Sequence, residues 1–393
     1  MVFRMQISLA QVITIKFVLK ETDITNFDMM TSRSSFFFIF LLTLCSLVSN
    51  LQVVSGQGIE GGMGGGMSNR IDGRVKFMPI PYVNYDRTMG FTVGAVPMVM
   101  FNPSAKDTIS PSSLVGGVGT WSTSKTWFLL GFGMFFLDQD NWRITTAGGI
   151  GTVNFQFYLD NPIGGWIPYS SEADFFLLKV ERRIYKSLYG GISYIFANVI
   201  TTTETLPITD TLTLQGIGFN LSFDTRSNPH YPRSGYYSTV NYNTYPGFLG
   251  NEAATQKIQL EHNHYFSARH NRDVVAARVH VGMGLGELDF NQQFIVKDKD
   301  IRGYTQGGYR GNYLLSLQGE YRWNFHPRWG AVGFAGVATV FKAINESDNG
   351  KLLPGIGSGI RFRAFPETNF SVGLDVAAGI DDWGIYFQIG EAF

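Results

Sequence analysis

Apolar and polar residues alternate with a period of two along most of the chain beyond residue 76. In one stretch Leu315, Leu317 and Tyr321 are separated by Ser316, Gln318 and Glu320. Segments 217–224 and 370–377 repeat the pattern. Successive side chains of a strand point to opposite faces, so these segments have one apolar face and one small or polar face. That division is typical of strands with lipid on one side and a barrel lumen on the other.

Turn signals divide this region into about sixteen strands, and bacterial barrels have an even number. The connections alternate in length. Tight ones are 138–141, 269–272, 326–328 and 366–369, and long ones are 160–173, 201–210, 288–312 and 341–351. Short periplasmic turns opposite long extracellular loops are expected of such barrels, although 101–112 is long on the short side. The sequence thus predicts an all-β fold, an antiparallel transmembrane β-barrel of about sixteen strands over 77–393.

Composition narrows the class of protein further. Formal net charge is zero, so nothing argues for a nucleic-acid partner. Charged residues make up 16%, against about 25% in ordinary soluble domains. Aromatic residues make up 15% and there are 46 glycines among the 393 residues, as suits a barrel with aromatic girdles. No apolar run of about 20 residues occurs after the N-terminal region, which excludes a helical membrane protein.

The N-terminal region has the order of a secretory signal peptide. Arg33 precedes the apolar run 36–48, and small residues follow up to Gly56, where we expect cleavage before Gln57. Residues 1–56 are therefore an N-terminal extension and signal peptide, with Met29 or Met30 as alternative starts. Residues 57–76 are a Gly-rich periplasmic tail.

The only cysteine, Cys45, lies inside the apolar run. It could be a lipid-attachment site, but Leu44 stands where a small residue is needed. Without residues 1–56 the chain has no cysteine, so we expect no disulfide in the mature protein.

Three motifs follow one another along the predicted barrel. Asp224, Arg226, Pro232 and Gly235 form an Asp-x-Arg…Pro-x-x-Gly turn; Ile301, Arg302, Gly303 and Tyr304 lie in a long loop; and the last predicted strand, 384–393, carries Phe387, Ile389 and a terminal Phe393. Together they resemble the Omp85 superfamily of outer-membrane barrels, to which BamA and TamA belong. In that family the Arg-Gly-aromatic motif lies in the sixth extracellular loop, and the terminal aromatic strand is a signal for barrel assembly.

The resemblance implies that the sixth loop folds into the lumen and carries Arg302 with it. A desolvated guanidinium needs carboxylates nearby, and the inward faces offer Glu320 and Asp375. The family often has a further acid in a Phe-x-Asp-x-Gly motif on the thirteenth strand, where this chain has Phe334-Ala-Gly336. The alternative is an arginine solvated in an open loop.

The junction of the first and last strands has unusual residues. The first strand contains Pro79 and Pro81, and the last contains Gly384 and Gly390. Proline lacks the N–H that a strand ladder needs, so weak pairing is one interpretation, and in BamA-like proteins this seam opens sideways. The other interpretation places both prolines in an entry segment below the membrane.

Nothing in the chain predicts an enzyme or a cofactor. His262 and His264 share one face of a strand, but no carboxylate or cysteine stands at ligand spacing nearby, so a lumen wall or a girdle is favoured over a metal site. The sequence has no Gly-x-Ser-x-Gly elbow.

The resemblance implies an outer-membrane barrel of the BamA and TamA type that helps to insert or translocate proteins at the bacterial outer membrane. A passive channel or a structural barrel with surface loops is the alternative. The family's periplasmic POTRA domains have no counterpart in the short tail, so client delivery would come from a separate periplasmic subunit or would not occur. Expected partners are outer-membrane lipid and client outer-membrane proteins.

Overall fold

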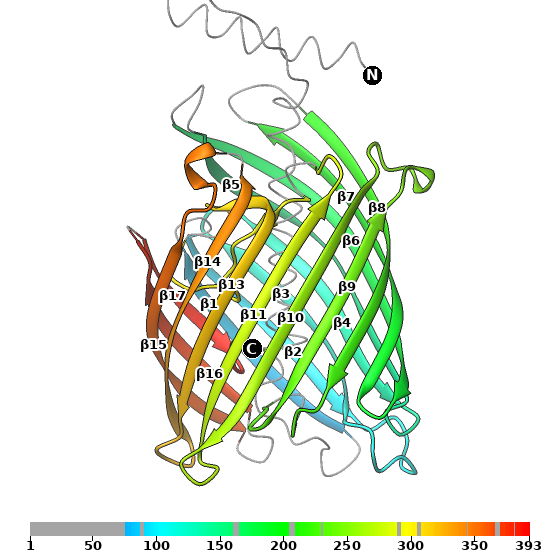
Figure 1. Cartoon of the computed structure of the whole chain (residues 1–393), viewed down its shortest axis with the longest axis vertical. Coiled ribbons are helices and arrows are strands. Elements are labelled where there is room, and N and C mark those ends of the chain that lie inside the picture. The colour runs from blue at the N-terminus through cyan, green and yellow to red at the C-terminus, as the bar shows by residue number, and fades with distance from the viewer. Residues whose placement is uncertain are drawn as a thin grey trace, which may run out of the picture.

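The computed structural model describes residues 75–86, 90–159, 165–203, 209–228, 231–288, 292–304, 308–343, 345–365, 370–380 and 382–393. The predicted signal peptide and nearly all of the predicted tail lie outside the described residues. The described chain forms one antiparallel sheet of seventeen strands, in which neighbours in sequence are neighbours in space and β1 also pairs with β17. The sheet therefore curves round into a barrel (Figure 1).

The strands keep their sequence order around the barrel. Their bounds are β1 (Val75–Asp86), β2 (Gly90–Phe101), β3 (Ser113–Ser122), β4 (Trp127–Leu137), β5 (Trp142–Leu159), β6 (Gly165–Tyr185), β7 (Leu188–Thr203), β8 (Thr209–Asp224), β9 (Gly235–Tyr245), β10 (Thr255–Ala268), β11 (Asp273–Leu285), β12 (Phe294–Ile295), β13 (Arg310–Trp323), β14 (Trp329–Ala343), β15 (Leu353–Phe365), β16 (Phe370–Ala378) and β17 (Trp383–Ile389). Two short 3-10 turns, η3 (Gly247–Leu249) and η4 (Glu346–Asp348), lie in loops.

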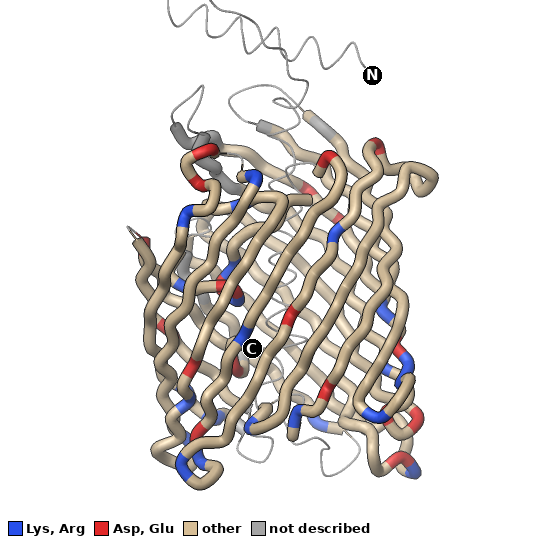
Figure 2. Tube along the Cα trace, viewed as in Figure 1, with Lys and Arg blue, Asp and Glu red and all other residues tan. Residues whose placement is uncertain are grey.

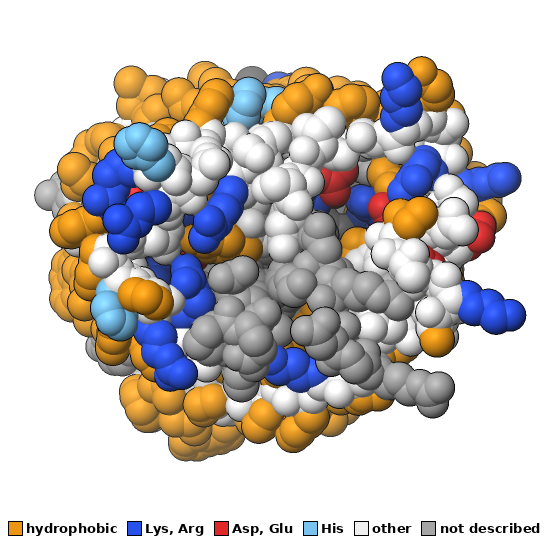
Figure 3. Space-filling view, turned by 90° about the horizontal axis from the view of Figure 1, so that it is seen from below, with side chains coloured by type: hydrophobic (Ala, Val, Ile, Leu, Met, Phe, Trp, Pro, Cys, Tyr) orange, Lys and Arg blue, Asp and Glu red, His pale blue; other side chains and the backbone are white. Residues whose placement is uncertain are grey.

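The predicted alternation decides which face of each strand meets lipid. On β13, Leu315, Leu317 and Tyr321 are 46%, 51% and 41% exposed, whereas Gln318 and Glu320 between them are 1% and 2% exposed. The same division holds along most strands, and the side of the barrel is covered by hydrophobic side chains (Figure 3). The prediction of a transmembrane antiparallel barrel is confirmed. The prediction of about sixteen strands matches the sixteen long strands, and the two-residue β12 is the extra one.

Exposed tryptophans mark both ends of the barrel wall. Trp121, Trp127 and Trp383 lie at the end with the long loops, and Trp142, Trp323 and Trp329 at the end with the short turns. Aromatic girdles of this kind sit at the two membrane–water interfaces. Among the described residues, no helix is long and apolar enough to span a membrane.

Two of the short turns are built from consecutive left-handed residues. Asp138, Gln139 and Asp140 have φ of 55°, 56° and 62°. Arg269, His270 and Asn271 have φ of 43°, 55° and 63°. Four of these six residues are Asp, Asn or His, which tolerate this region better than most residues.

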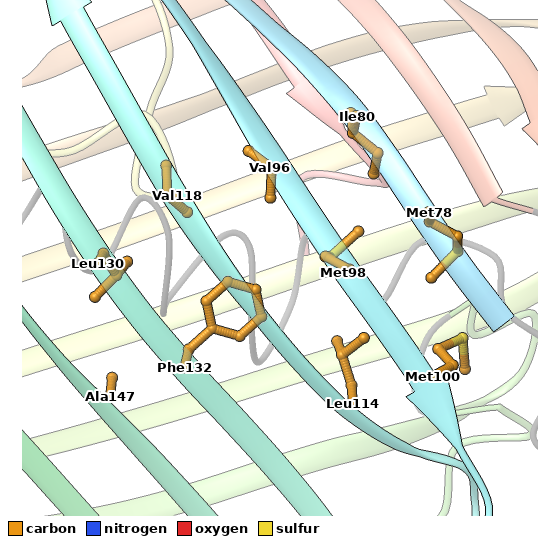
Figure 4. Packing of buried hydrophobic residues seen from close by; sticks show 10 residues of the cluster. All are labelled: Met78, Ile80, Val96, Met98, Met100, Leu114, Val118, Leu130, Phe132 and Ala147. Atoms are coloured by element: carbon orange, nitrogen blue, oxygen red, sulfur yellow. The ribbon is translucent and has the colours of Figure 1, made fainter. Parts of the chain in front are cut away.

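Part of the inner side of the barrel is apolar, and the period-two alternation did not predict this. On β1 to β5, buried inward side chains are Met78, Ile80, Val96, Met98, Met100, Leu114, Val118, Leu130, Phe132 and Ala147 (Figure 4). Outward neighbours such as Phe77 (60% exposed) are also apolar. Both faces of these strands are therefore hydrophobic, while charged inward residues concentrate on β13 to β16.

The last strand ends earlier than predicted. β17 stops at Ile389 and not at Phe393. Phe393 is 2% exposed and packs against the inner side of β10 and β11, so it does not share an outward face with Ile385 and Phe387. The expected strand 384–393 is thus wrong at its end, because the chain leaves the sheet at Gly390, whose φ is 86°.

Candidate functional site

The connection between β11 and β13 runs along the inner side of the barrel wall. Its segment 296–304 is largely buried. Lys299 O accepts hydrogen bonds from Arg278 Nη1 of β11 at 2.5 Å and from Gln318 Nε2 of β13 at 3.2 Å. Gly303 N donates to the hydroxyl of Tyr386 on β17 at 2.9 Å. We call 296–304 the lumen segment.

Arg302 is the best-enclosed side chain of the lumen segment, with no exposed area. Its Nη1 donates to Asp375 Oδ2 of β16 at 2.6 Å. Its Nη2 donates to Glu320 Oε2 of β13 at 2.7 Å and to Gln318 Oε1 at 2.9 Å. The planar guanidinium thus joins two strands that are not neighbours in the sheet. Such charge-assisted bonds offset the cost of desolvating the three charges.

Phe334 of β14 completes the surroundings of Arg302. The guanidinium carbon lies 3.3 Å from the centre of the Phe334 ring, which is the geometry of a cation–π contact. The acid that the family often carries two residues later is replaced by Gly336. The sequence showed that this acid is missing but did not predict the contact with the Phe334 ring. Phe334 shares the inward parity of its buried neighbours on β14, which was the available signal.

Each other residue of the motif has its own contact. Ile301 packs in an apolar cluster with Leu314 and Leu353. The Tyr304 hydroxyl donates to Pro354 O at 2.6 Å and accepts from Ile380 N at 3.1 Å. The motif therefore ties the lumen segment to β13, β15 and the chain after β16.

Gly303 is required by its backbone. Its φ is 110°, and an added Cβ would lie 2.5 Å from the carbonyl carbon of Ala378. A side chain at this position would both strain the backbone and collide with the neighbouring chain.

Asp300 is a second anchor that sequence reasoning missed. Its Oδ1 lies 2.7 Å from His280 Nδ1 and accepts from Ser316 Oγ at 3.1 Å. Burial by itself would raise the pKa of the Asp300 carboxyl. The charges of His280, Arg278 and Lys297 and the hydrogen bond to His280 outweigh burial and hold that pKa well below its usual range. Asp300 therefore stays ionised and bound to the wall.

The Asp-x-Arg turn motif also makes a local ion pair. Arg226 Nε and Nη2 each donate to Asp224 at 2.9 Å, and Arg143 of β5 reaches Asp224 Oδ2 at 3.0 Å. Pro232 is buried in the same turn, and Gly235 has φ of 90°. The motif thus shapes the β8–β9 turn and ties it to β5.

The two histidines of β10 lie on the outside of the barrel. His262 and His264 are close to one another and to Tyr236, with ring centres 5.7–5.8 Å apart, and His264 stacks on Phe266 at 4.0 Å. The structure therefore places them in an aromatic girdle. The described residues contain no group of three or more His, Cys, Asp or Glu arranged to hold a metal ion.

The junction of β1 and β17 is the weakest in the described barrel. Their register contains one residue pair, Tyr85 with Ile385. The other junctions between long strands contain from seven pairs (β16–β17) to eighteen (β5–β6). One ring contact also crosses it, between Tyr82 and Phe387 at 6.1 Å. Gly384 lies in β17 and Gly390 directly after it.

Both prolines of the first strand lie inside β1 and are paired with β2, not in a segment that precedes the strand. Pro79 is paired with Pro97 of β2. Because neither can donate, this pair does not exchange N–H···O bonds, and the nitrogen of Pro79 points away from β2. The same parity applies to Pro81. Both missing donors therefore lie on the edge of β1 away from β2. In the register that pairs Tyr85 with Ile385, Pro81 stands opposite the last residue of β17 and Pro79 lies beyond it.

Comparison with known families decides the relationship. Residues 128–393, about two thirds of the chain, match the model of the Omp85 superfamily domain. The chain belongs to the Omp85 superfamily. As an Omp85 barrel it is an outer-membrane protein, of a family whose barrels insert or transport proteins. No curated protein matches the chain.

The Omp85 barrel has a fold similar to that of several solved structures. It is similar to BamA from Haemophilus ducreyi lacking POTRA domains 1–3 (TM-score 0.55, 11% identity, 81% of this chain and 69% of that chain). It is also similar to CdiB from Acinetobacter baumannii (0.54, 12%, 81% and 60%) and to CdiB from Escherichia coli (0.56, 11%, 81% and 63%). The chain thus spans less than two thirds of either CdiB. At these identities the likeness shows the fold alone.

Proposed function

We propose that this chain is a BamA- or TamA-type barrel that inserts or translocates proteins at the outer membrane through the β1–β17 seam, without covalent chemistry. The observation that carries the proposal is the seam itself, which is joined by a single residue pair. Few ladder hydrogen bonds must break to separate these strands, whereas every other junction between long strands is joined by at least seven pairs.

The edge of β1 that points away from β2 supplies the chemistry of recognition. Along most of that edge β1 has no partner in the register with β17. Unpaired N–H and C=O groups of an edge strand bind another extended chain by strand addition. Pro79 and Pro81 remove two donors from this edge, so pairing with β17 stays weak and β17 is readily displaced.

Arg302 with its partners Glu320 and Asp375 holds the part of the barrel wall beside the seam in place. It joins β13 to β16, and β16 is the neighbour that holds β17 by seven pairs. We propose that opening separates β17 from β1, while β17 stays paired with β16 and β13 to β16 stay in place. Lipid surrounds the barrel, the clients are outer-membrane proteins, and a separate periplasmic subunit delivers them.

A disulfide lock tests the proposal in a Cys45→Ser background, because Cys45 is the only cysteine. Tyr85→Cys with Ile385→Cys would lock the seam. Val376→Cys with Ile385→Cys is the matched control, since Val376 is the β16 partner of the same Ile385. The measurement is insertion of an unfolded outer-membrane protein into proteoliposomes that contain the barrel.

The seam lock should abolish insertion, a reductant should restore it, and the control lock should have no effect. A seam-locked barrel with full activity would rule out lateral opening. Steady conductance in planar bilayers together with no insertion by the parent protein would instead support a passive channel.

A further inference from the structure

The three residues after Gly390 occupy a built position inside the barrel. Glu391, Ala392 and Phe393 are 4%, 0% and 2% exposed. The turn into the interior is fixed by Gly390, which has φ of 86° and donates its N–H to Ser371 O at 2.8 Å. The position of this end inside the outline of the barrel is visible in Figure 1.

Phe393 fills an apolar site on strands that do not adjoin β17. Its ring packs with Tyr265 of β10 and with Val274 and Ala276 of β11. Its carbonyl oxygen accepts a hydrogen bond from Arg322 Nη2 of β13 at 2.5 Å. In the sheet, β10, β11 and β13 are separated from β17 by β14, β15 and β16. The segment therefore crosses the interior from the seam strand to a distant part of the wall.

Glu391 gives the segment a second, ionic attachment. Its Oε2 lies 3.3 Å from Arg361 Nε of β15 and 3.7 Å from Arg322 Nε. Arg361 also pairs with Asp375, and Arg322 pairs with Glu320 at 2.8 Å. Charged residues colour the Cα trace part-way along the strands near this end of the chain (Figure 2).

These contacts close a ring of alternating charges. Asp375 and Glu320 are the two carboxylates that hold Arg302, at 2.6 and 2.7 Å. In order around the ring the members are Arg302, Glu320, Arg322, Glu391, Arg361 and Asp375. Three cations match three anions, each side chain touches two of opposite sign, and all are at most 5% exposed. Removal of one member leaves each of its two neighbours with a single partner and unbalances the buried charge.

We propose that the inner surface of β10, β11, β13 and β15 is a binding site for an acidic–aromatic segment of the type Glu-x-Phe. Its occupant is the chain's own residues 391–393. Occupancy holds β17 in the barrel in place of the ladder that β1 does not provide. The ring of six charges links the lumen segment to β17 through ion pairs. This inference deepens the proposed function, since the held strand is one side of the seam.

The test measures amide hydrogen exchange in the purified full-length barrel, with no client present. Phe393→Ala should raise the exchange rate of β17 by about tenfold or more, because the ring fills a buried apolar site. Exchange in β7 and β8, on the far part of the sheet, should not change. Phe325→Ala is the matched control, since Phe325 is exposed in the β13–β14 turn.

Glu391→Gln tests the ionic attachment of the segment to Arg361 and Arg322. It should speed exchange in β17 and also speed protease cleavage at Lys297 or Lys299 in the lumen segment, because the ring joins the two. Glu346→Gln, in an exposed loop, should do neither. If Glu391→Gln changes β17 but leaves cleavage as in the parent, the coupling of the two parts is refuted.

A folded Phe393→Ala barrel in which β17 exchanges at the parent rate would overturn the binding site. If that variant does not fold, Phe393→Leu decides, because leucine keeps an apolar side chain. An intermediate rise in β17 exchange supports the site, and the parent rate contradicts it. The readout does not involve insertion of a client. Failure of the seam-lock experiment with a positive exchange result therefore overturns the proposed function alone.

Discussion

Arg302 loses its hydration entirely, so its four polar and aromatic contacts decide whether the lumen segment stays in place. Substitution by alanine leaves Glu320 and Asp375 with one arginine each. Breaking a buried pair typically costs about 3–5 kcal/mol. We expect Arg302→Ala to keep the barrel, whose ladders do not involve Arg302, and to release the lumen segment. Faster protease cleavage at Lys297 or Lys299 and larger, noisier conductance would be the signs.

Arg302→Lys should recover only part of this loss, because lysine lacks the planar fork that reaches both carboxylates. Double-mutant cycles of Arg302→Ala with Glu320→Gln and with Asp375→Asn measure the two couplings separately. Strict additivity in both cycles, or a segment no more cleavable than the parent's, would show that other contacts hold it.

The backbone of the motif makes an independent prediction at Gly303. Gly303→Ala forces a Cβ to within 2.5–2.8 Å of Ala378 and Gly379 at a φ of 110°. We expect the segment to detach as in Arg302→Ala while all six ring charges remain. The check is the same protease assay, with Gly319→Ala as control, since a Cβ there meets nothing within 4 Å. Equal cleavage of Gly303→Ala and the control would contradict the close approach.

At this scale the sequence predicted only part of the site. Glu320 and Asp375 were predicted as partners of Arg302, because each lies on a strand whose alternation assigns it to the inner face. Asp300 was not, because a loop has no period from which to infer its direction. Glu391 was not, because it was placed in a strand that in fact ends at Ile389.

At the scale of elements, the two prolines of β1 determine how many hydrogen bonds its outer edge can form. Pro79→Val with Pro81→Val would restore two N–H donors on the edge of β1 away from β2, the donor at residue 81 opposite Ile389 of β17. We expect a longer β1–β17 ladder, slower amide exchange in β17 and reduced insertion activity. Pro97→Val is the matched control, because the nitrogen of Pro97 faces β3. Unchanged exchange in the double variant would show that the prolines do not weaken the seam.

The strands themselves were predictable because one rule, alternation, is imposed by lipid outside and a lumen inside. That rule fails where both faces are apolar, as at Phe77 and Met78, and where a tertiary contact takes over. Phe393 continues the apolar pattern of β17, yet the pocket of Tyr265, Val274 and Ala276 and the turn at Gly390 draw it inward. A period cannot show which of two apolar surroundings a side chain selects.

For the whole molecule, the two ends of the barrel differ in loop length and in charge. Among the described residues at the short-turn end, six basic side chains are exposed, and Asp138 is the only acidic one. The basic residues are Lys106, Arg182, Lys186, Arg269, Arg272 and Arg328. Lys and Arg are conspicuous at this end in Figures 2 and 3. At the other end the described residues include four exposed acidic residues (Glu172, Glu252, Glu287, Glu346) and three exposed lysines (Lys125, Lys342, Lys351).

These differences predict the orientation of the barrel. Short turns face the periplasm in outer-membrane barrels, and a basic rim there would meet the phosphates of the inner leaflet. In a Cys45→Ser background, Glu346→Cys in η4 should react with a membrane-impermeant maleimide on intact cells. Arg328→Cys, in the β13–β14 turn, should react only after the outer membrane is permeabilised. Both positions are exposed, so burial does not decide the difference. Labelling of Arg328→Cys on intact cells, with Glu346→Cys protected, would invert the barrel and place the Arg302 loop on the periplasmic side.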